Sequence, residues 1–208
     1  MREQIRSQQL LLPSDASGLV ALVGCVVLLG WLADIDTMKS LLPGFATMKA
    51  NTALCAIALG VGLFKAVGNE RRAESTGRAD LGLLLLAATS LLIALLTLAE
   101  YLWSLDFGID ALIGSPAASD SAQQLPMRMA SVAAVAIALG AGALLLLALP
   151  ATRRQSMPQL LATALGVLML TTTYGHLYAV EALYRTAELS AIALHSSIVF
   201  LAFALGLL

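Results

Sequence analysis

The sequence turns from apolar to polar at Glu100-Tyr101-Leu102-Trp103-Ser104-Leu105-Asp106-Phe107-Gly108-Ile109-Asp110. In this stretch an aromatic residue, Trp103, is followed three residues later by an acid, Asp106. The same spacing recurs at Trp31 with Asp34 and at Tyr178 with Glu181, each time where an apolar run ends. These three endings predict a threefold internal repeat.

The composition indicates an integral membrane protein. Only 12% of the 208 residues are charged, 59% are hydrophobic and the mean hydropathy is +0.87, whereas soluble domains carry about 25% charged residues. A bilayer core requires about 20 apolar residues per helix. Six runs approach that length: Ser17–Ala33, Ala50–Val67, Leu81–Leu105, Met129–Leu149, Leu160–Val180 and Ala191–Leu208. We therefore expect an all-α fold with six transmembrane helices in a lipid bilayer.

The six runs pair into three repeated helical hairpins within a single membrane domain, over residues 16–67, 81–149 and 157–208. Each returning helix carries a small-residue tag, Ala56 to Gly60, Ala136 to Gly140 or Ala202 to Gly206. An Ala-x-x-x-Gly spacing places two small residues on one helix face, where a neighbouring backbone can approach closely. A repeated unit of this kind buries its inner face only against the other units.

The basic residues predict the orientation, because cytoplasmic loops carry an excess of Lys and Arg. One side holds eight of them: Arg2, Arg6, Lys65, Arg71, Arg72, Arg78, Arg153 and Arg154. The other side holds four: Lys39, Lys49, Arg128 and Arg185. Both termini are therefore expected in the cytoplasm, with loops 34–49, 106–128 and 181–190 outside. The last run reaches Leu208 without closing polar residues, and we expect C-terminal output modules beyond it.

Several function classes find no support in the sequence. A net charge of −1 argues against a nucleic acid partner, which requires a basic face. No Walker A, HExxH, Gly-x-Ser-x-Gly or Cys-x-x-Cys pattern occurs, so no enzymatic activity is expected within these residues. Cys25 and Cys55 lie inside apolar runs and are interpreted as small buried hydrophobes.

Polar residues recur at one depth, near the outer ends of the predicted helices. The layer comprises Glu100, His176 and His195 together with Asn51, Ser131, Thr173, Tyr174 and Ser196. Ionisable groups in a membrane span usually face the bundle interior and pair there. We therefore predict a polar, ligand-accessible cavity in the outer half, with Glu100 either paired with a cation or protonated, because burial disfavours an isolated carboxylate.

His176 and His195 allow three interpretations. They could be structural, hydrogen-bonded to neighbouring polar groups between the last two helices. They could form a small-molecule or proton-sensing site, because imidazole changes charge near neutral pH. They could also bind haem or a metal, with Met38, Met48, Met127 or Met129 as further ligands. We expect no cofactor and keep the haem or metal site as the alternative.

Aromatic residues gather at the same depth: Trp31, Tyr101, Trp103, Tyr174, Tyr178 and Tyr184. Most are expected to be interfacial anchors, since their amphipathic rings favour the headgroup level of a bilayer.

Three segments carry a family resemblance that covers nearly the whole chain. They are Leu41 to Leu54, Glu100 to Trp103 with Gly108 to Asp110, and Tyr178 to Tyr184 followed by Ala193 to Ser196. The sequence resembles the multi-spanning N-terminal input regions of bacterial sensor histidine kinases and diguanylate cyclases. The resemblance implies an inner-membrane location, a homodimer, a role in two-component or related signal transduction, and PAS, kinase or GGDEF modules after the last helix. It supplies no catalytic residues.

The leading hypothesis is a membrane-embedded sensory input domain whose ligand the sequence does not name. A signal in the outer half would shift the packing of the hairpins and move the last helix. The rival hypotheses are a small transporter or channel and a redox protein that binds haem or a metal. A transporter would require a continuous polar path, but the inner halves of the predicted helices hold almost no ionisable residue.

Overall fold

The computed structural model describes residues 11–40, 46–72, 79–110, 127–152, 155–184 and 191–208. Within these ranges the regular structure is helical and contains no β-sheet: α2 (Leu11–Leu32), α3 (Asp36–Lys39), α4 (Ala50–Arg72), α5 (Leu81–Trp103), α6 (Ser131–Ala148), α7 (Met157–Leu177), the 3₁₀ helix η2 (Glu181–Leu183) and α8 (Leu194–Leu207). Much of the predicted outer loop 106–128, and the orienting charges Arg2, Arg6, Arg78, Arg153, Arg154 and Arg185, lie outside these ranges.

Five of these helices, α2, α4, α5, α6 and α7, are long and apolar enough to cross a bilayer. The prediction of an all-helical chain with membrane-spanning helices is confirmed to that extent. The sixth run yields a shorter helix, because α8 has 14 residues and starts only at Leu194. Ala193 before it is extended, with φ −72° and ψ 144°, and the amide of Ile192 is bonded to the carbonyl of Tyr184 at 3.1 Å.

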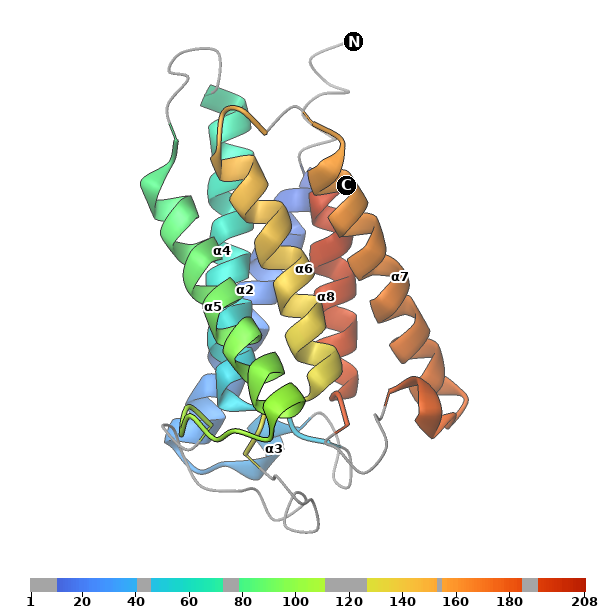
Figure 1. Ribbon diagram of the computed structural model, residues 1–208. Helices are drawn as coiled ribbons and strands as arrows, with labels where there is room; N and C mark the ends of the chain where they lie inside the picture. Colours follow the sequence, from blue (N-terminus) through green and yellow to red (C-terminus); the bar gives the residue numbers. More distant parts are fainter. Residues whose placement is uncertain (1–10, 41–45, 73–78, 111–126, 153–154, 185–190) are drawn as a thin grey trace.

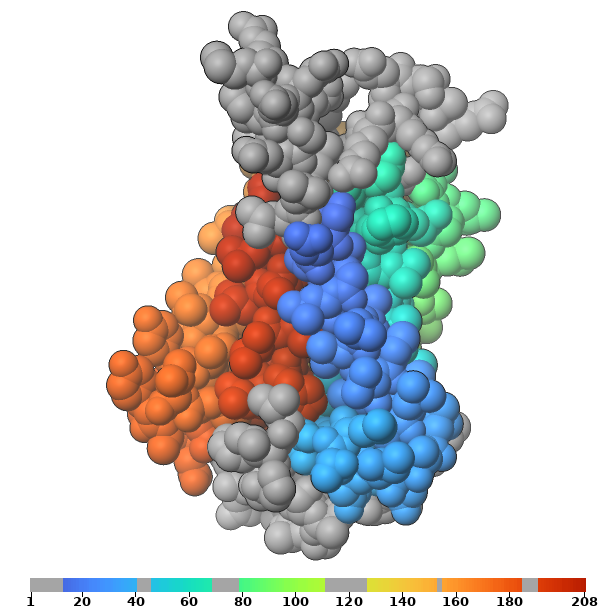
Figure 2. Space-filling view, turned by 180° about the vertical axis from the view of Figure 1, so that it is seen from behind, coloured from blue at the N-terminus to red at the C-terminus, as the bar shows by residue number. Residues whose placement is uncertain are grey.

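The long helices stand side by side in an up-and-down bundle (Figure 1). Each outgoing helix packs on its own returning helix, in the pairs α2 with α4, α5 with α6 and α7 with α8. Neighbouring pairs meet through α4 with α5, α6 with α7 and α8 with α2, so the six helices close into a ring. The returning helices α4, α6 and α8 also contact one another. Figure 2 shows the closing side of this ring, with α2 lying between α8 and α4.

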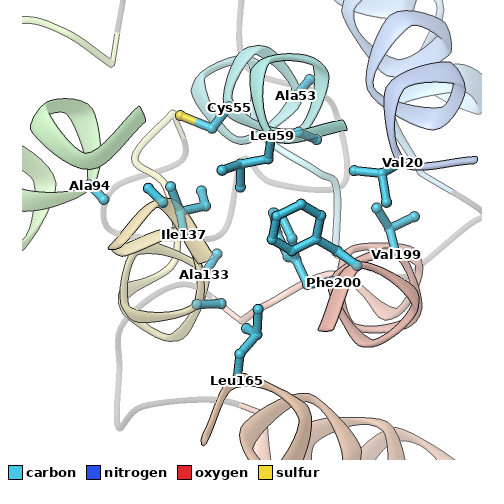
Figure 3. Packing of buried hydrophobic residues seen from close by; sticks show 14 of the residues in the cluster. Val20, Ala53, Cys55, Leu59, Ala94, Ala133, Ile137, Leu165, Val199 and Phe200 are labelled. Atoms are coloured by element: carbon cyan, nitrogen blue, oxygen red, sulfur yellow. The ribbon is translucent and has the colours of Figure 1, made fainter. Parts of the chain in front are cut away.

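The centre of the ring is filled by side chains of the returning helices α4, α6 and α8 and of the outgoing helix α7. Leu59, Ile137 and Leu165 point toward the ring of Phe200 (Figure 3), and Phe200, Leu59 and Ile137 are fully buried. The glycines of the predicted tags allow such close packing. A Cβ on Gly140 would lie 2.8 Å from Cε1 of Phe203, and a Cβ on Gly60 would lie 2.7 Å from the backbone nitrogen of Ala21.

The outward faces of α5 and α7 are apolar, as expected of helices in lipid. Large exposed side chains include Leu85, Leu92 and Leu95 on α5 and Leu160, Val167 and Leu170 on α7. Exposed threonines on these faces satisfy their own hydroxyl groups. Those of Thr89, Thr163 and Thr171 each donate to the carbonyl four residues earlier at 2.8 Å. A polar group that faces lipid would require such a bond, because a bilayer core offers no water.

Candidate functional site at the corner end

Three turns lie at one end of the bundle, which we call the corner end. It contains α3, residues 104–110 and η2, which follow α2, α5 and α7 respectively (Figure 1). The C-terminal end of α8 lies at the opposite end. The polar residues predicted from the sequence belong to the corner end.

One hydrogen bond recurs in all three hairpins. Nε1 of Trp31 donates to the carbonyl of Met48 at 2.8 Å, and the hydroxyl of Tyr101 donates to that of Met129 at 2.8 Å. Nε2 of His176 lies 3.0 Å from the carbonyl of Ile192 and must carry the proton there, because a carbonyl only accepts. Each donor stands in the last turn of an outgoing helix, and each acceptor precedes the returning helix by two residues. We call these three contacts the closing bonds.

The backbone after each donor also follows one pattern. The residue three positions later has a positive φ: 54° at Asp34, 52° at Ser104 and 54° at Ala179. These are the non-glycine residues with positive φ among those the structure describes. The left-handed conformation costs a non-glycine residue about 1–2 kcal/mol. The turn is therefore imposed by tertiary packing and not by the preference of the residue at its centre.

The first and third corners match further. Ile35 donates to the carbonyl of Gly30 and Val180 to that of Gly175, both at 2.8 Å. A short helix follows in each case, α3 or η2, and both begin with an acid. A Cβ on Gly30 would lie 2.5 Å from Cβ of Met38, and one on Gly175 would lie 2.6 Å from Cβ of Leu183. Glycine therefore lets the short helix lie directly against the long one.

These contacts place Trp31 in register with Tyr101 and His176. The alignment predicted from the sequence, Trp31 with Trp103 and Tyr178, is wrong by two residues in the first hairpin. The environments explain the difference, since Trp31 is 2% exposed whereas Trp103 is 67% and Tyr178 is 72% exposed. Trp31 is a buried hydrogen-bond donor and not an interfacial anchor.

Glu100 occupies the glycine position in the middle corner, because it directly precedes the donor Tyr101. Its carboxylate is fully buried. Oε1 accepts a hydrogen bond from the amide of Phe107 at 2.8 Å, and Oε2 lies 3.5 Å from Nε of Arg128. The expectation that Glu100 is paired is confirmed.

Arg128 is the cation that contacts the acidic groups of the middle corner. Its Nε donates to Oδ2 of Asp110 at 2.9 Å and its Nη2 to the carbonyl of Leu105 at 3.3 Å. The guanidinium also lies 5.6 Å from the centre of the Tyr101 ring. Burial lowers the pKa of Arg128, but the hydrogen bond to Asp110 and the charge of Glu100 raise it by more, so the net pKa lies above its ordinary value. Arg128 therefore stays charged in this cluster.

Asn51, in the first turn of α4, joins the first hairpin to the middle corner. Its side-chain amide donates to the carbonyl of Ile109 at 3.0 Å and to Oδ1 of Asp110 at 3.3 Å. Asp110 is thereby shared by Asn51 and Arg128. The structure thus brings two of the predicted site residues, Asn51 and Glu100, into one bonded network.

Lys39 plays the corresponding part in the first corner. Its side chain is fully buried, and Nζ lies 2.6 Å from Asp34, 2.9 Å from Asp36 and 4.9 Å from the centre of the Trp31 ring. Burial lowers the pKa of Lys39, but its hydrogen bonds to the two carboxylates raise it by more, so the net pKa lies above 10.5. A cation over the donor ring is therefore common to the first two corners.

In the third corner an aromatic ring replaces the cation. Tyr184 stacks on His176 with 4.0 Å between ring centroids. Tyr174 does not line the interior, since it is 51% exposed and stacks on the exposed ring of Tyr178 at 6.0 Å. The hydroxyl of Thr173 donates to the carbonyl of Met169 in its own helix. The predicted placement of Tyr174 in a polar cavity is therefore wrong.

His195 and Ser196 lie in the first turn of α8 and are buried, with 8% and 1% exposure. Neither ring nitrogen of His195 has a hydrogen-bond partner in the described part of the chain. Ser131, the first residue of α6, is partly buried. Among the described residues, no three His, Cys, Asp or Glu side chains gather in a way that could hold a metal ion.

Comparison with protein-family models, with curated proteins and with solved structures found no match. Two residues of the corner end, Arg128 and Lys39, were counted in the sequence only as orienting charges. Their sequence signal is their position, since each lies close to a predicted helix end on the side that holds few basic residues.

Proposed function

We propose that this chain is a membrane-embedded sensory input domain of a bacterial signal-transduction protein, of the histidine kinase or diguanylate cyclase type. The observation that carries the proposal is the uneven distribution of charged and apolar side chains in the interior of the bundle. Buried charged groups, Lys39, Glu100 and Arg128, gather at the corner end, whereas the centre of the ring is filled by Leu59, Ile137 and Phe200. One end is thus suited to respond to a signal, and the packed apolar part to transmit the response mechanically.

In this proposal the chain crosses the bacterial inner membrane six times as three hairpins, with both termini in the cytoplasm. The ring of helix contacts and the three closing bonds support a threefold unit. The short α8 is compatible with a span. Its 14 residues rise about 21 Å, and the extended residues before it add about 10 Å, which together match a hydrocarbon core of about 30 Å.

The response would reach the cytoplasm through α8. Its first turn lies in the corner end and its last residues lie at the opposite end. A change in corner packing that shifts α8 would bias an output module attached after Leu208, since a ligand acts by its unequal affinity for two arrangements. A homodimer belongs to this proposal through the family resemblance.

The alternatives receive less support. A channel along the ring axis would have to displace the packed side chains of Leu59, Ile137 and Phe200. Bis-histidine haem ligation would have to break the contacts of His176 with Ile192 and Tyr184. A small-molecule or proton-sensing role for the histidines remains compatible with the geometry of His195.

The proposal is tested on the natural full-length protein. We expect the reading frame to continue after Leu208 into a kinase or cyclase module, and a stop codon there would refute the input-domain role. Glu100→Gln, His176→Gln and His195→Gln are then introduced separately and output activity is measured. At least one should change the output at normal expression, while the lipid-facing control Leu92→Val, at an exposed position, should not.

A further inference from the structure

The contact between α8 and α2 closes the ring, and we call it the closing seam. Val199 of α8 and Val20 of α2 point toward one another within it (Figure 3). Away from the corner end the packing around α8 is tight, because a Cβ on Gly206 would lie 2.8 Å from Cδ2 of Leu63 and 3.0 Å from Cβ of Ala16. This close packing holds the end of α8 that lies away from the corner end.

His195 in α8 corresponds in position to Asn51 in α4. Each follows the acceptor of a closing bond by three residues, Met48 for Asn51 and Ile192 for His195. Helix α4 meets the outgoing helix of the next hairpin, α5, as α8 meets α2 around the ring. Asn51 has two acceptors in the corner beside it, whereas His195 has no hydrogen-bond partner in the described ranges.

An unpartnered imidazole is costly in a closed interior. The neutral ring leaves one donor and one acceptor unmet, and a buried unsatisfied group costs about 1–3 kcal/mol. The protonated ring would bring two unmet donors and a full charge, which costs more. Histidine is also the side chain whose ordinary titration falls between about pH 5 and pH 8. Protonation of His195 and burial of His195 therefore oppose each other.

The surrounding charges increase that opposition. Helix α8 packs against α7, α2, α6 and α4. The titratable and charged groups at the corner ends of these elements are His176, Glu181 and the phenols of Tyr174, Tyr178 and Tyr184 for α7, Asp34, Asp36 and Lys39 for α2, Arg128 for α6 and Lys49 for α4. The cations Lys39, Lys49 and Arg128 are at most 7% exposed, while the carboxylates of Asp34 and Asp36 are already bound by Lys39. A further buried positive charge finds no ready partner there.

We propose that His195 is a proton switch in the closing seam: neutral while α8 lies against α2, and protonated when the corner end of the seam opens to water. The inference rests on the proposed function and deepens it, because it names the proton as a signal. The same displacement of α8 would then pass to the opposite end of the bundle.

The switch is tested by measuring the distance between α2 and α8 in lipid nanodiscs. Spin labels are placed at Leu32→Cys and Ile198→Cys, both exposed positions. The background is Cys25→Ala, because Cys25 is exposed and not buried as predicted from the sequence, whereas Cys55 is buried. The label separation is expected to increase as the pH is lowered from about 8 to about 5. His195→Gln, which retains polarity but does not titrate, should abolish the change, and the control Leu92→Val, at an exposed position of α5 outside the corner end, should preserve it.

Two outcomes overturn the proposal: an unchanged separation in the otherwise native chain, or a pH-dependent separation that persists in His195→Gln. Because the chain contains only two histidines, ¹⁵N-histidine NMR assigns the titration directly, and the His195 signal should titrate together with the separation. Neither measurement needs an output module. If the label separation changes with pH but output activity stays unaltered, the sensory role alone is refuted. If the separation does not change with pH but Glu100→Gln or His176→Gln alters output activity, the switch alone is refuted.

Discussion

Glu100 occupies in the middle hairpin the position that Gly30 occupies in the first. Each directly precedes the ring that forms the closing bond, and each is followed four residues later by a residue with positive φ. At Gly30 the following short helix lies against the bare Cα. At Glu100 a side chain fills that place, and its buried carboxylate is held by Arg128 and the amide of Phe107.

Arg128→Met should therefore destabilise the protein strongly. Removing one member of a buried ion pair costs about 3–5 kcal/mol, because the remaining charge stays buried without its partner. The midpoint temperature of thermal unfolding in detergent should therefore fall strongly. Arg128→Lys should recover only part of the lost stability, since an ammonium cannot reproduce the planar donor geometry that reaches Asp110 and Leu105 together. Equal stability of both variants with the native chain would contradict this role.

Gly30→Ala and Gly175→Ala should each destabilise the protein by about 1–3 kcal/mol, the usual cost of overpacking. The new methyl group would meet Cβ of Met38 or Leu183 at 2.5 or 2.6 Å. Gly18→Ala is the matched control in α2, because no atom lies within 4 Å of its added Cβ. That substitution should be neutral or stabilising, by up to about 1 kcal/mol, since alanine favours a helix. Unfolding midpoints of the three variants measure the difference.

Tyr101→Phe should cost about 1 kcal/mol by removing one closing bond while keeping the ring. The carbonyl of Met129 would lose its donor, and α6 would be held less firmly at its first turn. Hydrogen exchange of the first amides of α6 should then accelerate. The exposed Tyr178→Phe, whose hydroxyl makes no closing bond, should leave that exchange rate unchanged.

The first corner should be insensitive to alkali until well above neutral pH. The pKa of Lys39 is raised in the folded state, so its stabilisation is fully present below the unfolded pKa of about 10.5 and is lost only as pH rises through the higher folded pKa. Trp31 fluorescence should follow that transition in a Trp103→Phe background. Lys39→Met should remove the alkaline transition, and its persistence would show that another group is responsible.

Hydropathy was sufficient to place five membrane-length helices, because burial in lipid acts on every residue of a run. The register of the corners was not accessible in the same way. The positive-φ residues three positions after the donors are an aspartate, a serine and an alanine, so glycine does not mark these positions. The donors themselves are a tryptophan, a tyrosine and a histidine. A shared geometry built from unlike residues leaves no pattern in a single sequence.

The site was predicted in part for a related reason. Glu100 and Asn51 stood out because a polar group near a helix end within an apolar run demands a partner. Their partners Asp110 and Arg128 lie in connecting segments, where charge is ordinary, and only the fold brings them together. The prediction for Tyr174 failed because depth along a helix does not determine which face of the helix a side chain occupies. Tyr174 lies on the outer face of its helix.

The closing bonds have an evolutionary consequence. Their acceptors are main-chain carbonyls, so the side chains of Met48, Met129 and Ile192 could be exchanged without loss of the bond. Of the two partners in each closing bond, inheritance would then constrain only the side chain of the donor, to a flat ring that carries an N–H or O–H group. A lineage could replace Trp31 by tyrosine or histidine and keep its architecture. Descendants of this domain would then share three ring positions after the rest of their sequences had diverged.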